Sequence, residues 1–130
     1  MDASVKLVRR LYDAFAASDF DTILAVMDPE LVVTQADALP WGGEFHGYEG
    51  LATFFGRLRE HITSEVTHAA LYGAGDHAVQ FGRTAGTVNA TGATFDIDEM
   101  HLFTIRDGRV VRFEAYIDTP AMLSALGGDG

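Results

Sequence analysis

The feature that most constrains the fold is the stretch from Phe95 to Asp118, which reads as two β-strands joined by a tight turn. The turn is predicted at 106–109, because Asp and Gly tolerate the positive φ that two-residue hairpin loops require. The flanks are rich in Val, Ile, Phe and Tyr, which favour half-buried strands. Strand alternation gives each strand one mostly apolar face, a candidate core face. These faces consist of Ile97, Glu99, His101, Phe103 and Ile105, and of Val111, Phe113, Ala115 and Ile117.

Glu99 and His101 are the polar exceptions on that face. In an apolar cavity, desolvation raises the pKa of a carboxylate and lowers that of an imidazole, while pairing opposes both shifts. Such a pair can act as base and acid near neutral pH, for example by abstracting a proton α to a carbonyl and returning it. Two alternatives stay open: a structural pair or one facing solvent, or a shifted alternation that turns Met100 and Leu102 inward.

The helices are expected in the first half of the chain. Residues 3–17 predict an amphipathic helix with its apolar stripe at i, i+3, i+4 and i+7. A second short helix follows Ser18 and ends at 28–29, because the residue before proline is disfavoured in the α region. Residues 48–61 predict a third helix. The two longer helices carry stripes of Val8, Leu11, Tyr12 and Phe15, and of Leu51, Phe54, Phe55, Leu58 and Ile62.

The strands are expected mostly in the second half. Residues 30–37 predict a first strand and 38–47 a loop. Strands at 63–72 and 77–88, separated by turns at 73–76 and 89–92, then lead to the hairpin. Pro120 begins a short C-terminal helix, and the final GGDG reads as a frayed tail. This order predicts an α+β fold: a cone-shaped, strongly curved, mostly antiparallel sheet wrapped around the N-terminal helices, with an apolar pocket.

Composition narrows the function. At 130 residues, the chain is expected to form one domain, 1–130. A formal net charge of −10 argues against nucleic acid and against an anionic membrane surface, and no apolar run approaches the ~20 residues of a membrane span. The absence of cysteine fits a cytoplasmic location. The five histidines lack paired ligand spacing, so no metal site is predicted.

The order of elements resembles the nuclear transport factor 2-like superfamily, and within it the SnoaL-like and ketosteroid-isomerase-like branch. The resemblance is carried by VRRLYDAFAASDFDTILAVMDPELV, GYEGLATFFGRLRE, RTAGTVNATG and DGRVVRFEAYIDTPAMLSAL. It implies a conical fold, an apolar pocket, frequent homodimers and no obligatory cofactor. The superfamily includes isomerases, cyclases, epoxide hydrolases, dehydratases and non-catalytic binding modules.

The resemblance also implies which residues line the pocket, because inward strand positions supply them. These are Gln35, Asp37, Gly82, Thr84 (or Arg83 in the other alternation), Glu99, His101, Phe113, Ala115 and Ile117. Ala115 stands where SnoaL-like cyclases carry an acid. The arginine and two aspartates of limonene epoxide hydrolases have no full match, since Thr84 and Ala115 occupy acid positions. Tyr12, Asp37 and Glu99 match the ketosteroid isomerase set only in chemical type.

Several candidates keep two interpretations. Trp41 is expected as a lid or rim residue, or as ordinary loop packing. Asp37 lines the pocket or ends its strand in water. Tyr116 and Asp118 are expected to pack outside and to cap the last helix. Tyr12, Phe15, Phe54 and Phe55 are expected in the core, with their inner edges lining the pocket.

The predicted function is a small-molecule pocket protein, most simply a cofactor-free acid–base enzyme of isomerase, cyclase or hydrolase type. Its substrate would be apolar and carry a carbonyl or hydroxyl group, with Glu99 and His101 catalytic and Gln35 orienting. The alternative is a non-catalytic ligand-binding or dimerisation module. A homodimer through the outer sheet face is expected, because that face would otherwise expose apolar residues. They are Val79, Phe81, Met100 and Leu102.

Overall fold

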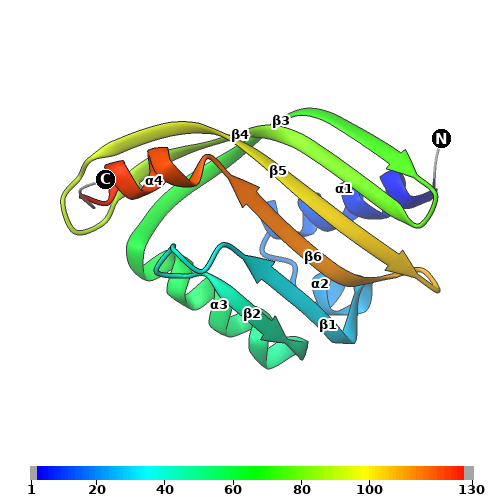
Figure 1. The fold of residues 1–130 in the computed structure, drawn as a ribbon. Coiled ribbons are helices and arrows are strands. Elements are labelled where there is room, and N and C mark those ends of the chain that lie inside the picture. The colour runs from blue at the N-terminus through cyan, green and yellow to red at the C-terminus, as the bar shows by residue number, and fades with distance from the viewer. Residues whose placement is uncertain (1–2, 128–130) are drawn as a thin grey trace.

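The computed structural model describes residues 3–127. Two helices come first, followed by two strands, a long helix, four long strands and a last short helix (Figure 1). The elements are α1 (Ala3–Ala16), α2 (Phe20–Val26), β1 (Met27–Gln35), β2 (Gly43–His46), α3 (Gly47–His61), β3 (Ile62–Ala74), β4 (His77–Val88), β5 (Thr94–Arg106), β6 (Arg109–Ile117) and α4 (Thr119–Ala125). Of the predicted GGDG tail, residues 128–130 lie outside the described part.

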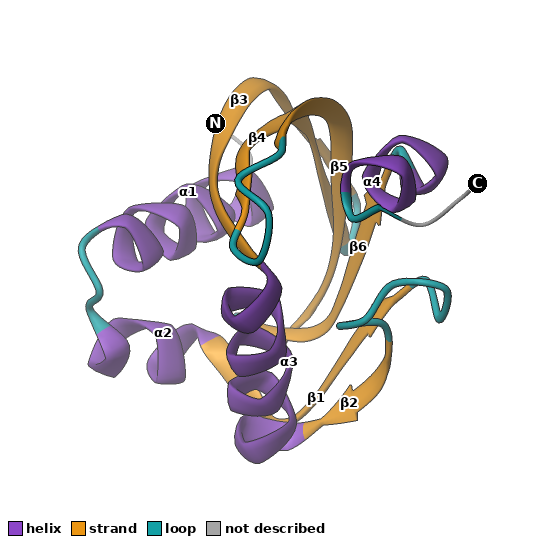
Figure 2. Cartoon of the chain, turned by 90° about the vertical axis from the view of Figure 1, so that its left-hand side faces the viewer, coloured by secondary structure: helices purple, strands orange, loops and turns teal. Residues whose placement is uncertain are grey.

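The strands form one open sheet in the order β2-β1-β6-β5-β4-β3. All neighbours are antiparallel except β1 and β6, which run parallel. The sheet is strongly curved, and α1, α2 and α3 lie on one side of it (Figure 2). The predicted α+β fold with a curved, mostly antiparallel sheet and N-terminal helices is therefore confirmed. No helix in the described region is long and apolar enough to cross a membrane.

Two glycines on β4 bring β3 and β4 into very close contact. A Cβ atom on Gly82 would lie 2.1 Å from the carbonyl oxygen of Thr67, and one on Gly86 would lie 1.9 Å from that of Thr63. The register of β3 also shifts between His68 and Ala70. Glycines and bulges of this kind let a long strand pair bend. They explain how β3 and β4 can curve and remain paired.

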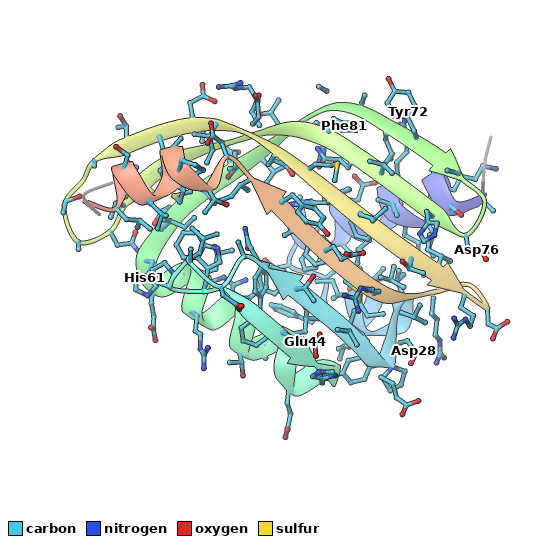
Figure 3. The ribbon with its side chains drawn as sticks, in the orientation of Figure 1. Asp28, Glu44, His61, Tyr72, Asp76 and Phe81 are labelled. Atoms are coloured by element: carbon cyan, nitrogen blue, oxygen red, sulfur yellow. The ribbon has the colours of Figure 1, made fainter. Side chains whose placement is uncertain are left out.

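The core fills the space between the concave face of the sheet and the helices, as the packed side chains in Figure 3 illustrate. The predicted stripe of α1 is buried at Val8 and Leu11, since apolar residues at this spacing share one helix face. From the sheet, Phe103 and Phe113 pack into the same core. Apolar helix and sheet faces thus close over each other, as the alternation predicts.

The helix caps and the hairpin turn follow the sequence signals. Asp118 caps α4 by accepting a hydrogen bond from the backbone N–H of Ala121 at 3.2 Å, as predicted. Tyr116 lies half-exposed on the outer face, where its hydroxyl donates to Glu114. Asp107 and Gly108 both adopt positive φ, at 52° and 75°, which confirms the two-residue turn.

Two predicted boundaries near the first strand are wrong. Helix α2 ends at Val26, and β1 already begins at Met27, so Pro29 lies inside a strand. It is tolerated because the register of β1 with β6 is interrupted between Met27 and Val32. The predicted loop 38–47 also contains β2, which pairs with β1. Its four residues are too few, and too close to glycines, to show a periodic pattern.

The predicted inner face of β6 is wrong at one position. Thr104 pairs with Arg112 and Ile105 with Val110, so the residue between, Val111, has no partner across the strands. This bulge gives the fully buried position to Val110 and leaves Val111 half-buried. Phe113 and Ala115 are buried as predicted.

Replacing Gly86 by Ala is expected to destabilise the protein by about 2 kcal/mol or more, on the scale of overpacking in a core. The new Cβ would meet backbone, which cannot move aside as a side chain can. The matched control is Gly56→Ala on the exposed face of α3, where a Cβ meets nothing within 4 Å; this change should stabilise by up to about 1 kcal/mol. Urea denaturation measures both. Equal effects would show that the close strand contact is not rigid.

Candidate active site

A cluster of polar side chains lies on the inner face of β4 and β5. Across these strands Gln80 pairs with His101, and Gly82 with Glu99. Glu99 is buried, whereas Met100 is half-buried on the opposite face. The structure therefore turns Glu99 and His101 inward and rules out the shifted alternation.

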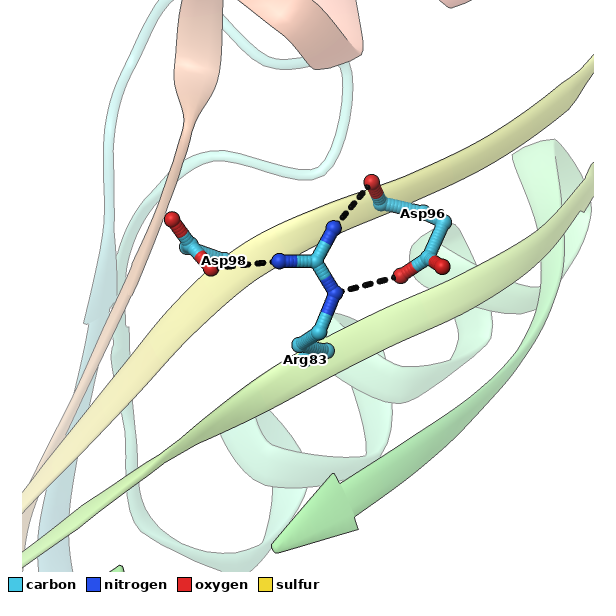
Figure 4. Close-up of polar contacts among 3 residues, drawn as sticks. All are labelled: Arg83, Asp96 and Asp98. Carbon is cyan, nitrogen blue, oxygen red and sulfur yellow. Dashed lines mark hydrogen bonds and ion pairs between the residues drawn. The ribbon is translucent and has the colours of Figure 1, made fainter. Parts of the chain in front are cut away.

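The outer face confirms this assignment. The guanidinium of Arg83 donates to the carboxylates of Asp96 and Asp98, both at 2.7 Å, and to the carbonyl of Asp96 (Figure 4). All three side chains are exposed to solvent. Arg83 is thus held on the outer surface and is not a pocket residue, while Thr84 takes the buried position.

His101 links two polar groups through its two ring nitrogens. Its Nε2 lies 3.1 Å from Oε2 of Glu99, a charge-pair distance. Its Nδ1 lies 2.6 Å from the hydroxyl of Tyr12 on α1. The same hydroxyl lies 3.5 Å from Oε1 of Gln80, to which it can donate a long hydrogen bond. Glu99, His101, Tyr12 and Gln80 therefore form one connected group, called the polar cluster below.

Aromatic rings enclose the polar cluster. The rings of His101 and Phe113 meet edge to face at 5.0 Å, and Phe103 packs edge to face against Tyr12 at 5.7 Å. On the other side, His68 of β3 lies 4.2 Å from the Tyr12 ring. The side chain of Glu99 is 0% exposed and that of His101 13%. An apolar wall of this kind removes most of the water that would otherwise stabilise charge.

Burial sets the protonation of the polar cluster. It raises the pKa of Glu99 from 4.5 to about 7, partly opposed by the neighbouring amide of Gln80. It lowers the pKa of His101 from 6.5 to about 3, and the neighbouring His68 adds to that shift. Burial, followed by the charge of Glu99, raises the pKa of the Tyr12 hydroxyl. Near pH 7, His101 and Tyr12 are neutral, and Glu99 is divided between its two forms.

Gly82 gives the polar cluster its room. The position a Cβ would take on Gly82 lies 2.6 Å from Nε2 of Gln80. The Gln80 amide thus occupies the space opposite Glu99 that any larger residue would fill. Nevertheless, Nε2 of Gln80 and both carboxylate oxygens of Glu99 are buried without a hydrogen bond of good geometry. Such atoms are uncommon in folded proteins and mark a site whose polar groups serve something beyond stability.

Three predicted pocket residues lie apart from the polar cluster. Trp41 is fully buried, and its indole N–H donates to Oε1 of Gln35 at 3.0 Å. The Trp41 ring also packs at 6.0 Å from His61. Of the two predicted interpretations of Trp41, the structure therefore shows the packed one. Asp37 lies exposed in the turn after β1.

The predicted aromatic residues join the helices to each other. Phe15 on α1 and Phe55 on α3 contact at 5.2 Å, and Phe54 lies 5.3 Å from Phe55. Closer to the polar cluster, Ala115 pairs with His101 and Ile117 with Glu99 across β5 and β6. The small Ala115 and the branched Ile117 keep this neighbouring strand free of charge at the points nearest the pair.

Sequence reasoning missed Gln80 and His68. Gln80 has a signal, because it shares the alternation that places Gly82 and Thr84 inward. His68 has none, because the register shift after it breaks the alternation of β3. Its contact with Tyr12 depends on the curvature of the sheet.

The polar cluster is enclosed. Two hollows on the described surface, of about 560 and 380 Å³, lie elsewhere: one beside α1 and α2, the other near the β5–β6 turn. Charged side chains line much of both, and neither includes Glu99 or His101. Volume is a weaker guide than chemistry here, because only the enclosed cluster contains buried, unpaired polar atoms. Within residues 3–127, no three His, Asp or Glu side chains are grouped as metal ligands.

Comparison with known proteins gives a consistent result. The family model of the SnoaL-like domain matches residues 8–113. No curated protein matches the chain. An NTF2-like protein of unknown function from Burkholderia pseudomallei K96243 shares 25% identity and superposes with a TM-score of 0.88, covering 97% of this chain and 98% of that one.

Two further solved structures are similar over almost their whole length. TerC, co-crystallised with polyporic acid, has a TM-score of 0.87 at 23% identity and covers 97% of this chain and 99% of its own. A candidate SnoaL-like polyketide cyclase from Jannaschia sp. CCS1 has a TM-score of 0.83 at 24% identity, covering 98% and 93%. At these identities the two structures show a shared fold.

Replacing Glu99 by Gln is expected to stabilise the protein, and more so as the pH rises. The folded protein holds the Glu99 proton more tightly, because its pKa is about 7 instead of 4.5. That contribution is fully present below about pH 4.5 and is lost as the pH rises through 7. Gln has no proton to lose, so the difference in unfolding free energy should grow between pH 4.5 and 8, by at most about 3 kcal/mol.

Urea denaturation at several pH values measures this difference. The lowered pKa of His101 acts in both proteins and largely cancels in the comparison. The matched control is Glu65→Gln on the exposed part of β3, which should give a difference that does not vary with pH. A flat difference for Glu99→Gln as well would mean that Glu99 titrates normally and is not buried as described.

Proposed function

This chain belongs to the family of SnoaL-like domains, and on that premise we propose that it is a cofactor-free acid–base catalyst acting on an apolar small molecule. The substrate would carry a carbonyl or hydroxyl group. The observation that carries the proposal is the enclosed carboxyl of Glu99 beside the uncharged His101. A general base works best when its pKa lies near the working pH, and burial brings Glu99 to that value.

Glu99 and His101 receive different roles. The Glu99 carboxylate removes a proton from a carbon next to a carbonyl; the C–H electron pair forms a C=C bond, and the carbonyl oxygen becomes an enolate oxygen. The carboxylic acid then returns the proton to the same or another carbon, so no oxidant or reductant is needed. His101 is uncharged near pH 7, so it serves as the hydrogen-bonded partner of Glu99 and not as an imidazolium acid.

The apolar neighbours are the proposed substrate-binding surface. Phe113, Ala115 and Ile117 lie beside the pair on β6, and Thr84 is buried on β4. Tyr12, Phe15, Phe54 and Phe55 come from the helices, while Gln35, Asp37 and Trp41 would form a more distant rim. The crystallisation of TerC with polyporic acid supports a ligand-binding role for this fold, and the Jannaschia candidate cyclase supports an enzymatic one.

A non-catalytic ligand-binding module is the second candidate. The enclosure of the polar cluster favours it, since neither surface hollow reaches Glu99. Turnover would require side chains to move and admit the substrate. A compound that binds and protects the protein against unfolding, but is never converted, would favour this second function.

The outer sheet face is the proposed homodimer surface. Tyr72, Phe81 and Tyr116 are 60%, 44% and 46% exposed, and Figure 3 shows Tyr72 and Phe81 on the outside of the sheet. Phe81 pairs with Met100, and Met100 with Tyr116, so the apolar residues run across three strands. A contiguous apolar face of this kind is typical of association. The cytoplasmic location and the single domain stay predictions from the sequence.

Glu99→Gln is expected to reduce turnover by about 10²- to 10⁴-fold, the usual contribution of a general base. The assay follows solvent deuterium incorporation and product formation for a panel of enolisable apolar ketones. Glu65→Gln, on the exposed part of β3, should retain activity. Equal activity of both variants on a converted substrate would remove Glu99 from the mechanism.

Phe81→Asp is expected to shift the protein from dimer to monomer, because it places a charge in the centre of the apolar outer face. The matched control is Phe20→Asp, which alters an even more exposed phenylalanine on α2, at 61%. Sedimentation velocity over a range of concentrations measures both. A monomeric wild type, or dissociation by the Phe20 change alone, would contradict a dimer through this face.

A further inference from the structure

The polar cluster joins an enclosed carboxyl to a less enclosed hydroxyl. Glu99 has no exposed side-chain surface. Tyr12, at the other end, is half-buried and stacks on the exposed His68. A carboxyl that exchanges protons with a substrate must also recover its own protonation state, and Glu99 has no direct contact with water for this. The path available to it leads through His101 to Tyr12.

The contacts fit such a path because they lie on opposite sides of one ring. Glu99 lies 3.1 Å from Nε2 of His101, and Tyr12 lies 2.6 Å from Nδ1. A neutral imidazole carries one proton and can hold it on either nitrogen. His101 can therefore accept a proton on one side while releasing another on the other side, and its own charge stays zero before and after.

Two hydrogen-bond arrangements follow. With Glu99 ionised, Nε2–H of His101 points to the carboxylate, and the Tyr12 hydroxyl donates to Nδ1. With Glu99 protonated, its O–H points to Nε2, and Nδ1–H donates to the Tyr12 oxygen. The Tyr12 hydroxyl then needs another acceptor, and Oε1 of Gln80 lies 3.5 Å away. Gln80 is fully buried beside them.

We propose that Tyr12 is the outer end of a proton relay through His101 to Glu99, and that Gln80 is the positioning residue that receives the Tyr12 hydroxyl when the relay reverses. This deepens the proposed function and rests on it. In one passage, a proton reaches the Tyr12 oxygen as the Tyr12 proton moves to Nδ1 and the Nε2 proton moves to Glu99. Three O–H or N–H bonds form and two break, with one proton gained by the cluster.

The surroundings support a single relay. From α1, Tyr12 faces His101, and Asp13 acts on His68 from the same helix. From β3, His68 is the titratable neighbour of the cluster. From β6, the neighbours are the uncharged Phe113, Ala115 and Ile117, while Arg83 and its two aspartates lie on the outer face. Within the described chain, the proton of Glu99 therefore has one polar route out.

The relay can be tested without a substrate, by following the protonated nitrogen of His101 with ¹⁵N NMR and the Glu99 carboxyl with ¹³C NMR between about pH 5 and 9. The expected result is a change from Nδ1–H at low pH to Nε2–H at high pH, with the same midpoint as Glu99. One unchanging tautomer while Glu99 titrates would overturn the relay, and so would a doubly protonated His101.

Variants separate the two proposed roles. In Tyr12→Phe, Nδ1–H loses its acceptor, so His101 should keep Nε2–H at all pH values while Glu99 still titrates. In Gln80→Leu, the low-pH form should lose part of its Nδ1–H population. Tyr116→Phe, a matched change on the outer face, should behave as wild type. An intact tautomer change in Tyr12→Phe would overturn the role of Tyr12, and an unchanged population in Gln80→Leu would overturn that of Gln80.

The outcome is distinct from that of the proposed function. If the tautomer stays fixed but Glu99→Gln abolishes turnover, the relay is wrong and the acid–base function holds. If the tautomer changes but no ketone in the panel exchanges deuterium, the relay holds and the proposed function fails.

Discussion

The close contact between β3 and β4 at Gly82 is the constraint on which both the fold and the site depend. The carbonyl of Thr67 approaches this glycine so closely that no Cβ fits, which lets the two longest-paired strands curve around the helices. The missing side chain also leaves space on the inner face opposite Glu99, and the Gln80 amide fills it. One residue thus shapes the sheet and gives the buried carboxyl its polar neighbour.

The curved sheet in turn determines the protonation of the cluster. Its inner face closes Phe103 and Phe113 around His101, and α1 covers the remaining side with Tyr12. Burial then outweighs pairing: it keeps His101 uncharged and lifts the pKa of Glu99 to about 7. A buried ion pair would instead require each charge to be stabilised by hydrogen bonds, and the two Glu99 oxygens have none of good geometry. The arrangement favours proton exchange over structural pairing.

The sequence predicts this site as far as local periodicity reaches. Alternation on β5 places Glu99 and His101 inward, and the helical stripe of α1 places Tyr12 in the core, because both patterns depend only on neighbouring residues. Alternation fails wherever the register shifts: it misassigns Val111 at the β6 bulge and cannot place His68. The hydrogen bond between Tyr12 and His101 joins residues 89 positions apart. Such contacts depend on the three-dimensional curvature, which no short window of sequence contains.

The position of Ala115 explains how this site differs from the cyclases it resembles. Where those relatives are expected to carry an acid on the last strand, this chain has a methyl group paired directly with His101. A second carboxylate there would face His101 across the strands and favour its charged form. With Ala115 in place, His101 stays neutral, and the only acidic side chain of the cluster is on the neighbouring strand at Glu99. The carboxyl has moved by one strand, and the neutral histidine is the consequence that makes a relay, rather than an ion pair, the natural state of this site.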